Sequence, residues 1–252
     1  MGKVYIVTGG SNGMGKFMSK RLADDGHSVL ITGRDEEKLK AAVEEIGTGD
    51  NVAYFQMDVR EYEMAEQMIQ SAVKKFGTVD GLINNAAGNF ICPIEKMSPN
   101  AWRSVIDIVL NGTFNCTKAA GDYWIEHDIK GTIINMVATY AWNAGAGVAH
   151  SAAAKAGVLS LTRTVAVEWG HKYGIRANAI APGPIERTGG AEKLFESEEA
   201  AKRTVQSVPL KRLGKPEEIA GLAAFMLSDE AAYMNGECVT LDGGQWLNAF
   251  PF

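Results

Sequence analysis

The amino-acid sequence predicts a single α/β domain in which helices cover both faces of a seven-stranded parallel sheet. Short β-branched apolar runs alternate with longer segments of helical period along the whole chain. No linker, repeat or low-complexity stretch divides the 252 residues, and about 250 residues is a common size for one α/β domain. A glycine-rich turn separates the first apolar run from the first helical segment, as in domains that bind phosphates at this point.

The expected strands are short and rich in β-branched residues, and most of the expected helices end at a glycine, which favours the left-handed cap. The long fourth helix begins at Ser98-Pro99, a capping residue followed by the proline that suits a first helical turn. The expected strands are residues 4–8, 28–32, 52–57, 79–84, 132–137, 176–180 and 237–241. The expected helices are residues 14–25, 36–46, 61–76, 98 to about 128, 152–173 and one that begins at Pro216.

This alternation implies parallel strands joined by right-handed crossovers, which is a doubly wound, Rossmann-type sheet. Ligands of such sheets bind beyond the carboxyl ends of the strands. The less regular segment 183–209 follows the sixth strand, so it is a candidate substrate lid. A plain surface loop with a short helix is the alternative.

Composition excludes several classes of protein. The net charge is −5, which argues against nucleic acid or an anionic membrane as a partner. No apolar stretch is long enough to span a membrane. The four histidines and the carboxylates show no metal-ligand spacing, and the three cysteines form no disulfide framework. We therefore expect a cytoplasmic protein without a metal.

The glycine-rich turn predicts a site for a dinucleotide. Its glycines follow the spacing GxxxGxG from Gly9, which differs from the GxGxxG fingerprint, so the prediction rests on the position between strand and helix. Glycine lets the backbone approach a pyrophosphate at the positive end of a helix. The expected cofactor-binding residues of this turn are Gly9, Ser11, Asn12, Gly13, Met14 and Gly15.

The residues after the second strand indicate which nicotinamide cofactor is used. A site for NAD places a carboxylate there for the ribose 2′-hydroxyl, but the residue that follows here is Arg34. A planar guanidinium can grip a 2′-phosphate through two hydrogen bonds, so we expect NADP(H). Asp35 keeps NAD open as an alternative. Asp58 and Val59 follow the third strand and are expected beside the adenine, although Asp58 also fits a capping role in a turn.

Further motifs at the strand ends resemble the short-chain dehydrogenase/reductase family. They are Asn84-Asn85-Ala86-Ala87-Gly88, Lys155, Pro182-Gly183-Pro184-Ile185 and the closing Asp242-Gly243-Gly244. The resemblance spans residues 3–244. It implies a homotetramer in which the two long helices pack between subunits. It also implies that the dinucleotide is lined by Asn84, Asn85, Ala86, Lys155, Pro182, Gly183 and Ile185.

One departure from the family's usual catalytic motif narrows the range of reactions expected of this chain. The usual catalytic motif is Tyr-x-x-x-Lys, but Ser151 stands four residues before Lys155, and Ala138 stands near the position of the upstream catalytic serine. A tyrosine occurs instead at Tyr140. Together with residues 84–91 and 98–113, this arrangement resembles the NADPH-dependent 2,4-dienoyl-CoA reductases of the family. It implies reduction of 2,4-dienoyl-CoA to 3-enoyl-CoA in unsaturated fatty acid degradation.

The resemblance also implies a role for each catalytic residue. Tyr140 and Asn89 are expected to donate hydrogen bonds to the thioester oxygen, where charge develops after hydride reaches C5. Tyr140, or a water held by Tyr140 and Ser151, is the expected proton donor at C2. Lys155 is expected to hold the nicotinamide ribose, and Asn111 to disrupt its helix and support a water relay to Lys155. Ser151 as a capping residue and Asn89 as a turn former are the alternatives.

The acyl-CoA substrate should meet basic and apolar residues at the mouth of the site. The expected contacts are Arg60, Phe90, Ser98 and Lys193, with Arg187 as a weaker candidate. Each basic residue alone also fits a solvated surface charge. Trp124 and Trp169 fit either a subunit interface or the core. Two other functions stay open: a carbonyl reductase of the same family, and a dinucleotide-binding protein without turnover.

Overall fold

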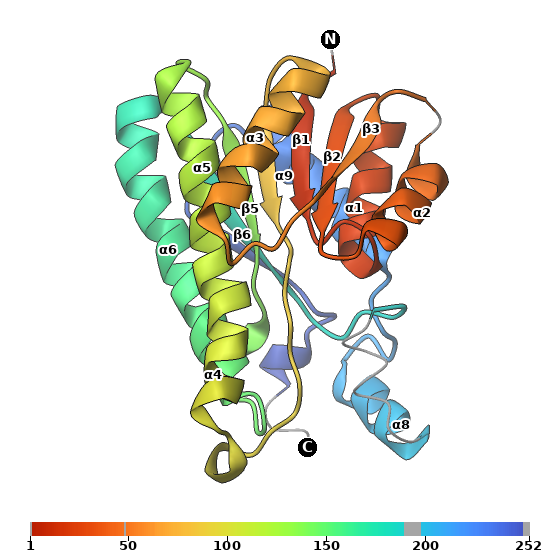
Figure 1. Cartoon of the computed structure of the whole chain (residues 1–252). Coiled ribbons are helices and arrows are strands. Elements are labelled where there is room, and N and C mark those ends of the chain that lie inside the picture. The colour runs from red at the N-terminus through yellow and green to blue at the C-terminus, as the bar shows by residue number, and fades with distance from the viewer. Residues whose placement is uncertain (1, 48, 189–197, 249–252) are drawn as a thin grey trace.

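A computed structural model describes residues 2–47, 49–188 and 198–248. Seven strands form one sheet in the order β3-β2-β1-β4-β5-β6-β7, and all neighbouring strands are parallel (Figure 1). The seven-stranded parallel sheet predicted from the sequence is confirmed. The strands are β1 (Val4–Thr8), β2 (Ser28–Gly33), β3 (Val52–Gln56), β4 (Gly81–Asn84), β5 (Thr132–Met136), β6 (Arg176–Pro182) and β7 (Cys238–Leu241).

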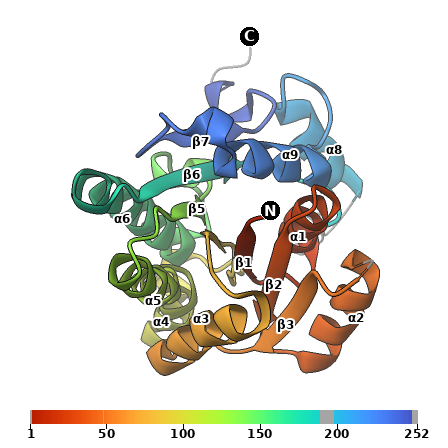
Figure 2. The same cartoon turned by 90° about the horizontal axis from the view of Figure 1, so that it is seen from above.

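Two layers of helices cover the sheet. Viewed from above, α1, α2 and α9 lie on one face, while α3, α4, α5 and α6 lie on the other (Figure 2). None of the described helices is long and apolar enough to cross a membrane. The α-helices are α1 (Gly13–Asp24), α2 (Glu36–Ile46), α3 (Tyr62–Phe76), α4 (Pro99–Ile106), α5 (Gly112–Glu126), α6 (Ala149–Tyr173), α8 (Glu198–Ser207) and α9 (Pro216–Leu227).

The long fourth helix of the prediction is interrupted. A π turn, η2 (Asp107–Asn111), separates α4 from α5. The extra residue in a π turn rotates the side chains that follow it relative to a continuous α-helix. The candidate lid 183–209 contains α8, which has no buried residue, and its residues 189–197 lie outside the described part of the chain.

Three apolar clusters hold the sheet between its helices. The first gathers side chains beneath α1, α2 and α9, the second beneath α3, α5 and α6, and the third between α4, η2, α6 and strand β6. Trp124 is fully buried in the second core, and its indole Nε1 donates to the Val79 carbonyl at 2.7 Å. Trp169 packs against the same core. Of the two alternatives for Trp124, the structure selects the core.

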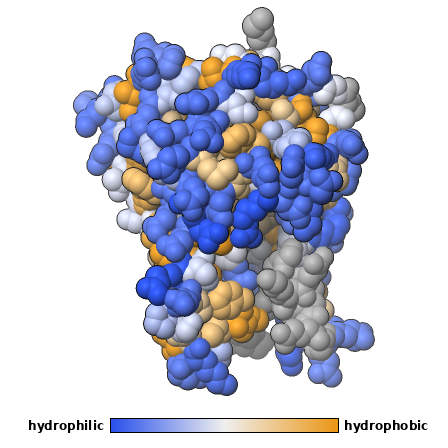
Figure 3. All heavy atoms as spheres, viewed as in Figure 1, coloured by the Kyte–Doolittle hydropathy of each residue, from blue (hydrophilic) through white to orange (hydrophobic). Residues whose placement is uncertain are grey.

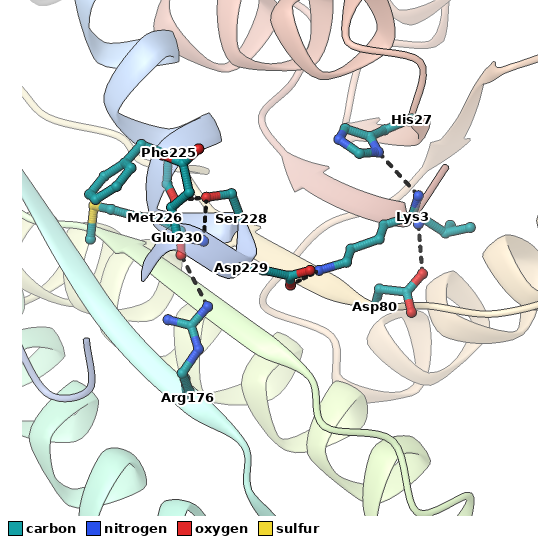
Figure 4. A network of polar contacts seen from close by, with 10 residues as sticks. Lys3, His27, Asp80, Arg176, Phe225, Met226, Ser228, Asp229 and Glu230 are labelled. Carbon is teal, nitrogen blue, oxygen red and sulfur yellow. Dashed lines mark hydrogen bonds and ion pairs between the residues drawn. The ribbon is translucent and has the colours of Figure 1, made fainter. Parts of the chain in front are cut away.

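The amino ends of the strands carry a polar network far from the carboxyl ends where ligands bind (Figure 4). The backbone N–H of Lys3 donates to Nδ1 of His27 at 3.1 Å, and the Lys3 ammonium pairs with Asp229 at 2.8 Å. Asp80 accepts the backbone N–H of Val4 at 2.7 Å. These contacts join the start of β1 to segments that precede β2, β4 and β7. The network therefore joins the amino ends of the strands, whereas the candidate site lies at the opposite, carboxyl end of the sheet.

Candidate active site

The glycine-rich turn brings the backbone very close to the start of α1. A Cβ atom at Gly15 would lie 2.3 Å from the Gly9 carbonyl oxygen, so only glycine fits this helix position. Gly9 and Gly13 have φ values of 63° and 49°, which other residues rarely adopt. Asn12 precedes the helix, makes no side-chain capping bond within the described chain, and is followed by no acidic residue in the first turn. These backbone N–H groups suit an anion.

The segment after β4 braces this turn. The Thr8 hydroxyl accepts the backbone N–H groups of Asn85 and Ala86 at 3.0 and 2.9 Å. The Asn85 amide donates to the carbonyls of Thr8 and Gly9. The Asn84 side chain does not line the turn, because it is buried and donates to Thr117 and Asn135 at 3.0 and 2.8 Å. The side chain thus joins β4 to β5 and α5, and only its Oδ1 has no hydrogen-bond partner among the described residues. The expected place of Asn84 beside the dinucleotide stays a prediction.

The two residues after β2 have different surroundings. Asp35 caps α2, because its carboxylate accepts the backbone N–H of Lys38 at 3.2 Å and pairs with the Lys38 ammonium. Arg34 is exposed, and its guanidinium makes no hydrogen bond or ion pair within the described ranges. A capping carboxylate is less available for a ribose hydroxyl than Arg34 is for a phosphate. Of the two residues, the arginine is therefore the one open to a ligand.

Asp58 and Arg60 lie together after β3. Arg60 grips Asp58 through several hydrogen bonds, the shortest of which is 2.5 Å. This contact holds the pKa of the Asp58 carboxyl below its usual value, and the nearby charge of Arg34 adds to the effect. Arg60, which was expected to contact the acyl-CoA substrate, is therefore paired with Asp58 in the structure. Val59 is buried between them and packs against Gly112 of α5.

Two candidate catalytic side chains, Tyr140 and Ser151, meet at the start of α6, and a third, Lys155, follows one turn later. Tyr140 lies in the short helix η3 (Thr139–Ala141) after β5, and its hydroxyl is 3.2 Å from Ser151 Oγ. Ser151 is buried on the third position of α6, and Lys155 follows one turn later on the same side. Burial raises the pKa of Tyr140, and the hydrogen bond with Ser151 acts in the opposite direction. Tyr140 is thus a protonated donor at neutral pH.

Lys155 is buried beside the end of β5. Its ammonium donates to the Met136 carbonyl at 2.5 Å. Burial lowers the pKa of Lys155 to about 8, because removal from water disfavours the charged form. The ammonium is fixed by a backbone group of the sheet, and its remaining N–H donors can serve a hydroxylated ligand.

Asn89 and Phe90 lie in the segment that joins β4 to α4 and packs against the start of α6. The Asn89 Oδ1 accepts the backbone N–H of Phe90 at 2.9 Å, and the Phe90 ring meets the His150 ring edge-on at 4.6 Å. Exposed apolar side chains continue along this segment at Ile91 and Ile94. Figure 3 shows apolar surface in the lower half of the molecule, where this segment runs. Asn89 and the start of α6 thus belong to one cluster.

Three comparisons with known proteins agree on the family. A family model described as enoyl-(acyl carrier protein) reductase matches residues 9–245. A crystal structure of a short chain dehydrogenase from Bacillus anthracis is 62% identical, with a TM-score of 0.92 over 99% of this chain and 98% of that one. The chain belongs to the short-chain dehydrogenase/reductase family.

Curated relatives within this family carry reductase names. A protein of Bacillus subtilis, 67% identical over 99% of both chains, is named "Probable 2,4-dienoyl-CoA reductase [(2E)-enoyl-CoA-producing]". A protein of Danio rerio, 38% identical over 98% of this chain and 82% of its own length, is named "Peroxisomal 2,4-dienoyl-CoA reductase [(3E)-enoyl-CoA-producing]". The two names differ in the position of the double bond that remains in the product.

The hydrogen bond of the Asn111 side chain lies within its own helix. Asn111 is exposed at the end of the π turn, and its amide donates to the Asp107 carboxylate at 2.9 Å. Val109, two residues earlier in the same turn, is buried. The predicted disruption of the helix is present as the π turn, and the Asn111 side chain pairs with Asp107, one turn earlier in the same helix. The expected relay from Asn111 to Lys155 stays a prediction.

Two of the residues expected to contact the substrate have other partners in the structure. Ser98 caps α4 by accepting the backbone N–H of Ala101 at 3.1 Å. Arg187 stacks over the Phe17 ring at 4.8 Å and pairs with Glu217 at 2.6 Å. Lys193 lies outside the described residues. The structure thus gives Ser98 and Arg187 local roles in the fold.

The motif after β6 closes the cofactor end. Gly183 packs against Asp242, where a Cβ atom would lie 2.6 Å from the Asp242 Cα. Pro182 pairs with Leu241 in the sheet. The Ile185 side chain is buried in the core near Gly214, so only its backbone can face a cofactor. Thr188 then lies beside Gly13 of the glycine-rich turn, at 3.8 Å from a Cβ built there.

Sequence reasoning missed two groups of this site. The Met136 carbonyl that holds Lys155 is a backbone atom, so no side-chain motif signals it. His150 is fully buried beside Ser151, and the sequence shows only a histidine before a serine. One feature of the sequence could have pointed to His150. Val148, at the capping position of α6, is apolar, so the first N–H groups of the helix need an acceptor from another side chain.

Proposed function

We propose that this protein reduces 2,4-dienoyl-CoA to 3-enoyl-CoA with NADPH, in the degradation of unsaturated fatty acids. The observation that carries the proposal is the pair formed by Tyr140 and Ser151, 3.2 Å apart and one turn from Lys155. A tyrosine in this place, with a serine where the usual family members have theirs, supports the dienoyl thioester over a simple ketone. The names of the relatives from Bacillus subtilis and Danio rerio support the same substrate class.

The residues around the glycine-rich turn fit a dinucleotide. The close packing at Gly15 and the uncapped start of α1 leave backbone donors for a pyrophosphate. Arg34 favours NADPH over NADH, because Asp35 is already the cap of α2. Lys155 would hold the nicotinamide ribose hydroxyls. When bound, this cofactor supplies the hydride.

The chain's own residues stabilise the charge that the reaction creates. Hydride addition at C5 of a 2,4-dienoyl thioester moves negative charge along the conjugated chain to the thioester oxygen. Tyr140 and Asn89 are proposed to donate hydrogen bonds to that oxygen. Such preorganised donors act most strongly in a site that excludes water, and Tyr140 is held in place by Ser151. The Lys155 ammonium adds a positive charge one turn away.

The position of the proton donor decides the product. The dienolate can be protonated at C2, which gives a 3-enoyl thioester, or at C4, which gives a 2-enoyl thioester. C2 is bonded to the carbonyl carbon, whereas C4 is two carbons farther along the chain. The Tyr140 and Ser151 hydroxyls lie together, so a donor bound to the thioester oxygen reaches C2 more easily. We therefore propose the 3-enoyl product.

Exposed helices support two further parts of the proposal, the homotetramer and the lid. Helices α5 and α6 expose apolar side chains, among them Phe114 and Val167, which is consistent with the proposed homotetramer built through these helices. The segment 183–209 is proposed as the lid, because α8 has no buried residue to anchor it. Light scattering in solution tests the first proposal, and substrate-dependent protection of α8 from hydrogen exchange tests the second.

The experiment that tests the function measures NADPH oxidation at 340 nm with 2,4-decadienoyl-CoA and, separately, with acetoacetyl-CoA. We expect oxidation with the dienoyl thioester and none with the ketone. Oxidation with the ketone alone would identify a carbonyl reductase. Tight NADPH binding without turnover of either substrate would identify a dinucleotide-binding protein, which the absence of the usual Tyr-x-x-x-Lys motif would then explain.

A further inference from the structure

His150 is a buried polar residue beside the site that the proposed chemistry does not use. It is the second residue of α6 and is 0% exposed. Its Nδ1 accepts the backbone N–H of Ser151 at 2.8 Å. Because Nδ1 is an acceptor, the neutral ring carries its proton on Nε2. Among the described residues, Nε2 has no hydrogen-bond partner.

The hydrogen bond from Ser151 replaces a missing helix cap. The first N–H groups of a helix need acceptors from outside the helix. The capping position of α6 is Val148, whose side chain has no acceptor. His150 supplies the acceptor from inside the first turn. Burial lowers the pKa of His150 and outweighs a contact with the Val148 backbone that acts in the opposite direction.

The same ring holds the segment that carries Asn89. Phe90 meets the His150 ring edge-on at 4.6 Å, and the Phe90 backbone N–H binds the Asn89 side chain. Nearby, the backbone N–H of Cys92 donates to the Gly147 carbonyl at 2.8 Å. The start of α6 and the segment after β4 are thus clasped together, with His150 between them.

We infer that His150 is a positioning residue that fixes Ser151 through its Nδ1 acceptor and Asn89 through Phe90. A fully buried ring cannot touch the substrate, so it acts only through these two neighbours. A buried N–H without a partner is costly, so packing alone would favour phenylalanine at this position. What phenylalanine lacks is the acceptor at Nδ1. The roles of Ser151 and Asn89 in turnover rest on the proposed function.

Three substitutions separate the two contacts. His150→Asn keeps an acceptor near Nδ1 and loses the ring, whereas His150→Phe keeps the ring contact with Phe90 and loses the acceptor. His150→Ala loses both. His171→Asn, on the exposed last turn of the same helix, is the matched control. Each variant is measured by hydrogen exchange of residues 88–93 and 149–155, by NADPH affinity, and by kcat and KM with 2,4-decadienoyl-CoA.

The two contacts give distinct expected patterns. His150→Asn should speed exchange only in residues 88–93 and raise KM, while His150→Phe should speed exchange only in residues 149–155 and lower kcat. His150→Ala should do both and lower kcat/KM about tenfold or more, since small displacements of reacting groups have large effects. NADPH affinity should change much less than turnover in all of them.

Two results would overturn the inference. One is unchanged exchange in both segments of His150→Ala. The other is a loss of NADPH affinity as large as the loss of turnover, which would indicate general damage to the fold. If the parent protein fails to turn over the dienoyl thioester, the proposed function is wrong, and the exchange pattern still decides whether His150 holds the two segments.

Discussion

Replacing Tyr140 with phenylalanine removes one hydroxyl and leaves the aromatic ring in place. That hydroxyl lies 3.2 Å from Ser151 Oγ. Burial raises the pKa of Tyr140, and the Ser151 hydrogen bond only partly offsets this, so the group is a donor across the neutral range. The substitution therefore deletes the proposed donor to the thioester oxygen without changing the charge of the site.

The size of the effect follows from what the donor does in the transition state. Removing one preorganised donor to a developing oxyanion costs about 2.7–4 kcal/mol, which lowers kcat by about 10²–10³-fold. A neutral hydrogen bond such as that to Ser151 contributes only about 1 kcal/mol to stability, so the fold should persist. We expect kcat to fall at least about a hundredfold with NADPH affinity unchanged.

The assay is NADPH oxidation at saturating 2,4-decadienoyl-CoA, with cofactor binding followed by fluorescence. Tyr54→Phe is the matched control, because it removes a hydroxyl that donates to Glu36 at 3.1 Å, away from the site. The control should keep the parent rate. A Tyr140→Phe variant with near-parent kcat would remove Tyr140 from the chemistry and refute the assignment of the oxyanion donor.

Four further results are expected. Arg34→Ala should raise KM for NADPH about tenfold to a hundredfold, the loss expected for a hydrogen bond to a charged group, and leave KM for NADH nearly unchanged. Lys20→Ala, which breaks an exposed ion pair with Asp24 in the last turns of α1, is the control, and equal effects on both cofactors would contradict the choice of NADPH. Ser151→Tyr should not reduce acetoacetyl-CoA, because position 151 is buried against Tyr140, and efficient ketone reduction would count against the account. The pKa of Lys155 is lowered to about 8, so kcat/KM should fall as pH rises through about 8 and the ammonium is lost, whereas a plateau to pH 10 would show that its charge is not needed. Burial lowers the pKa of His27 from 6.5, so the folded state favours the neutral ring and the free energy of unfolding should fall as pH drops below 6.5. His27→Asn keeps an acceptor for the Lys3 backbone N–H, and its free energy of unfolding in urea should fall less over the same pH range. Identical pH profiles for the two proteins would refute this.

The sheet was predictable because its signals are local. Each strand is a short apolar run, and helix α2 (Glu36–Ile46) has the predicted bounds. A disruption of the long helix at Asn111 was expected only through family resemblance, and its form as a π turn was not predicted, since one extra residue in a helix leaves no periodic signal over so short a span. Its register decides which neighbours Asn111 meets, and the hydrogen bond from that side chain to Asp107 could not be read from the sequence.

The residue types of the candidate site were predictable from local motifs, but the contacts between them were not. Tyr140 and Ser151 are eleven residues apart, and only the turn after β5 shows that their hydroxyls meet. Asp35 and Arg34 are adjacent in sequence, but the capping bond that occupies Asp35 depends on where α2 begins. The grip of Arg60 on Asp58 and the burial of His150 depend on tertiary packing, which patterns of single residues do not encode.

The measurement that tests the account most directly is the structure of the product formed in heavy water. The protein would be incubated with NADPH and 2,4-decadienoyl-CoA in D₂O, and the product examined by NMR. The account predicts a double bond at C3 and deuterium at C2, where a donor near Tyr140 and Ser151 delivers it. Deuterium at C4 with the double bond at C2 would contradict the proposed position of the proton donor, and an unreacted diene would contradict the proposed function.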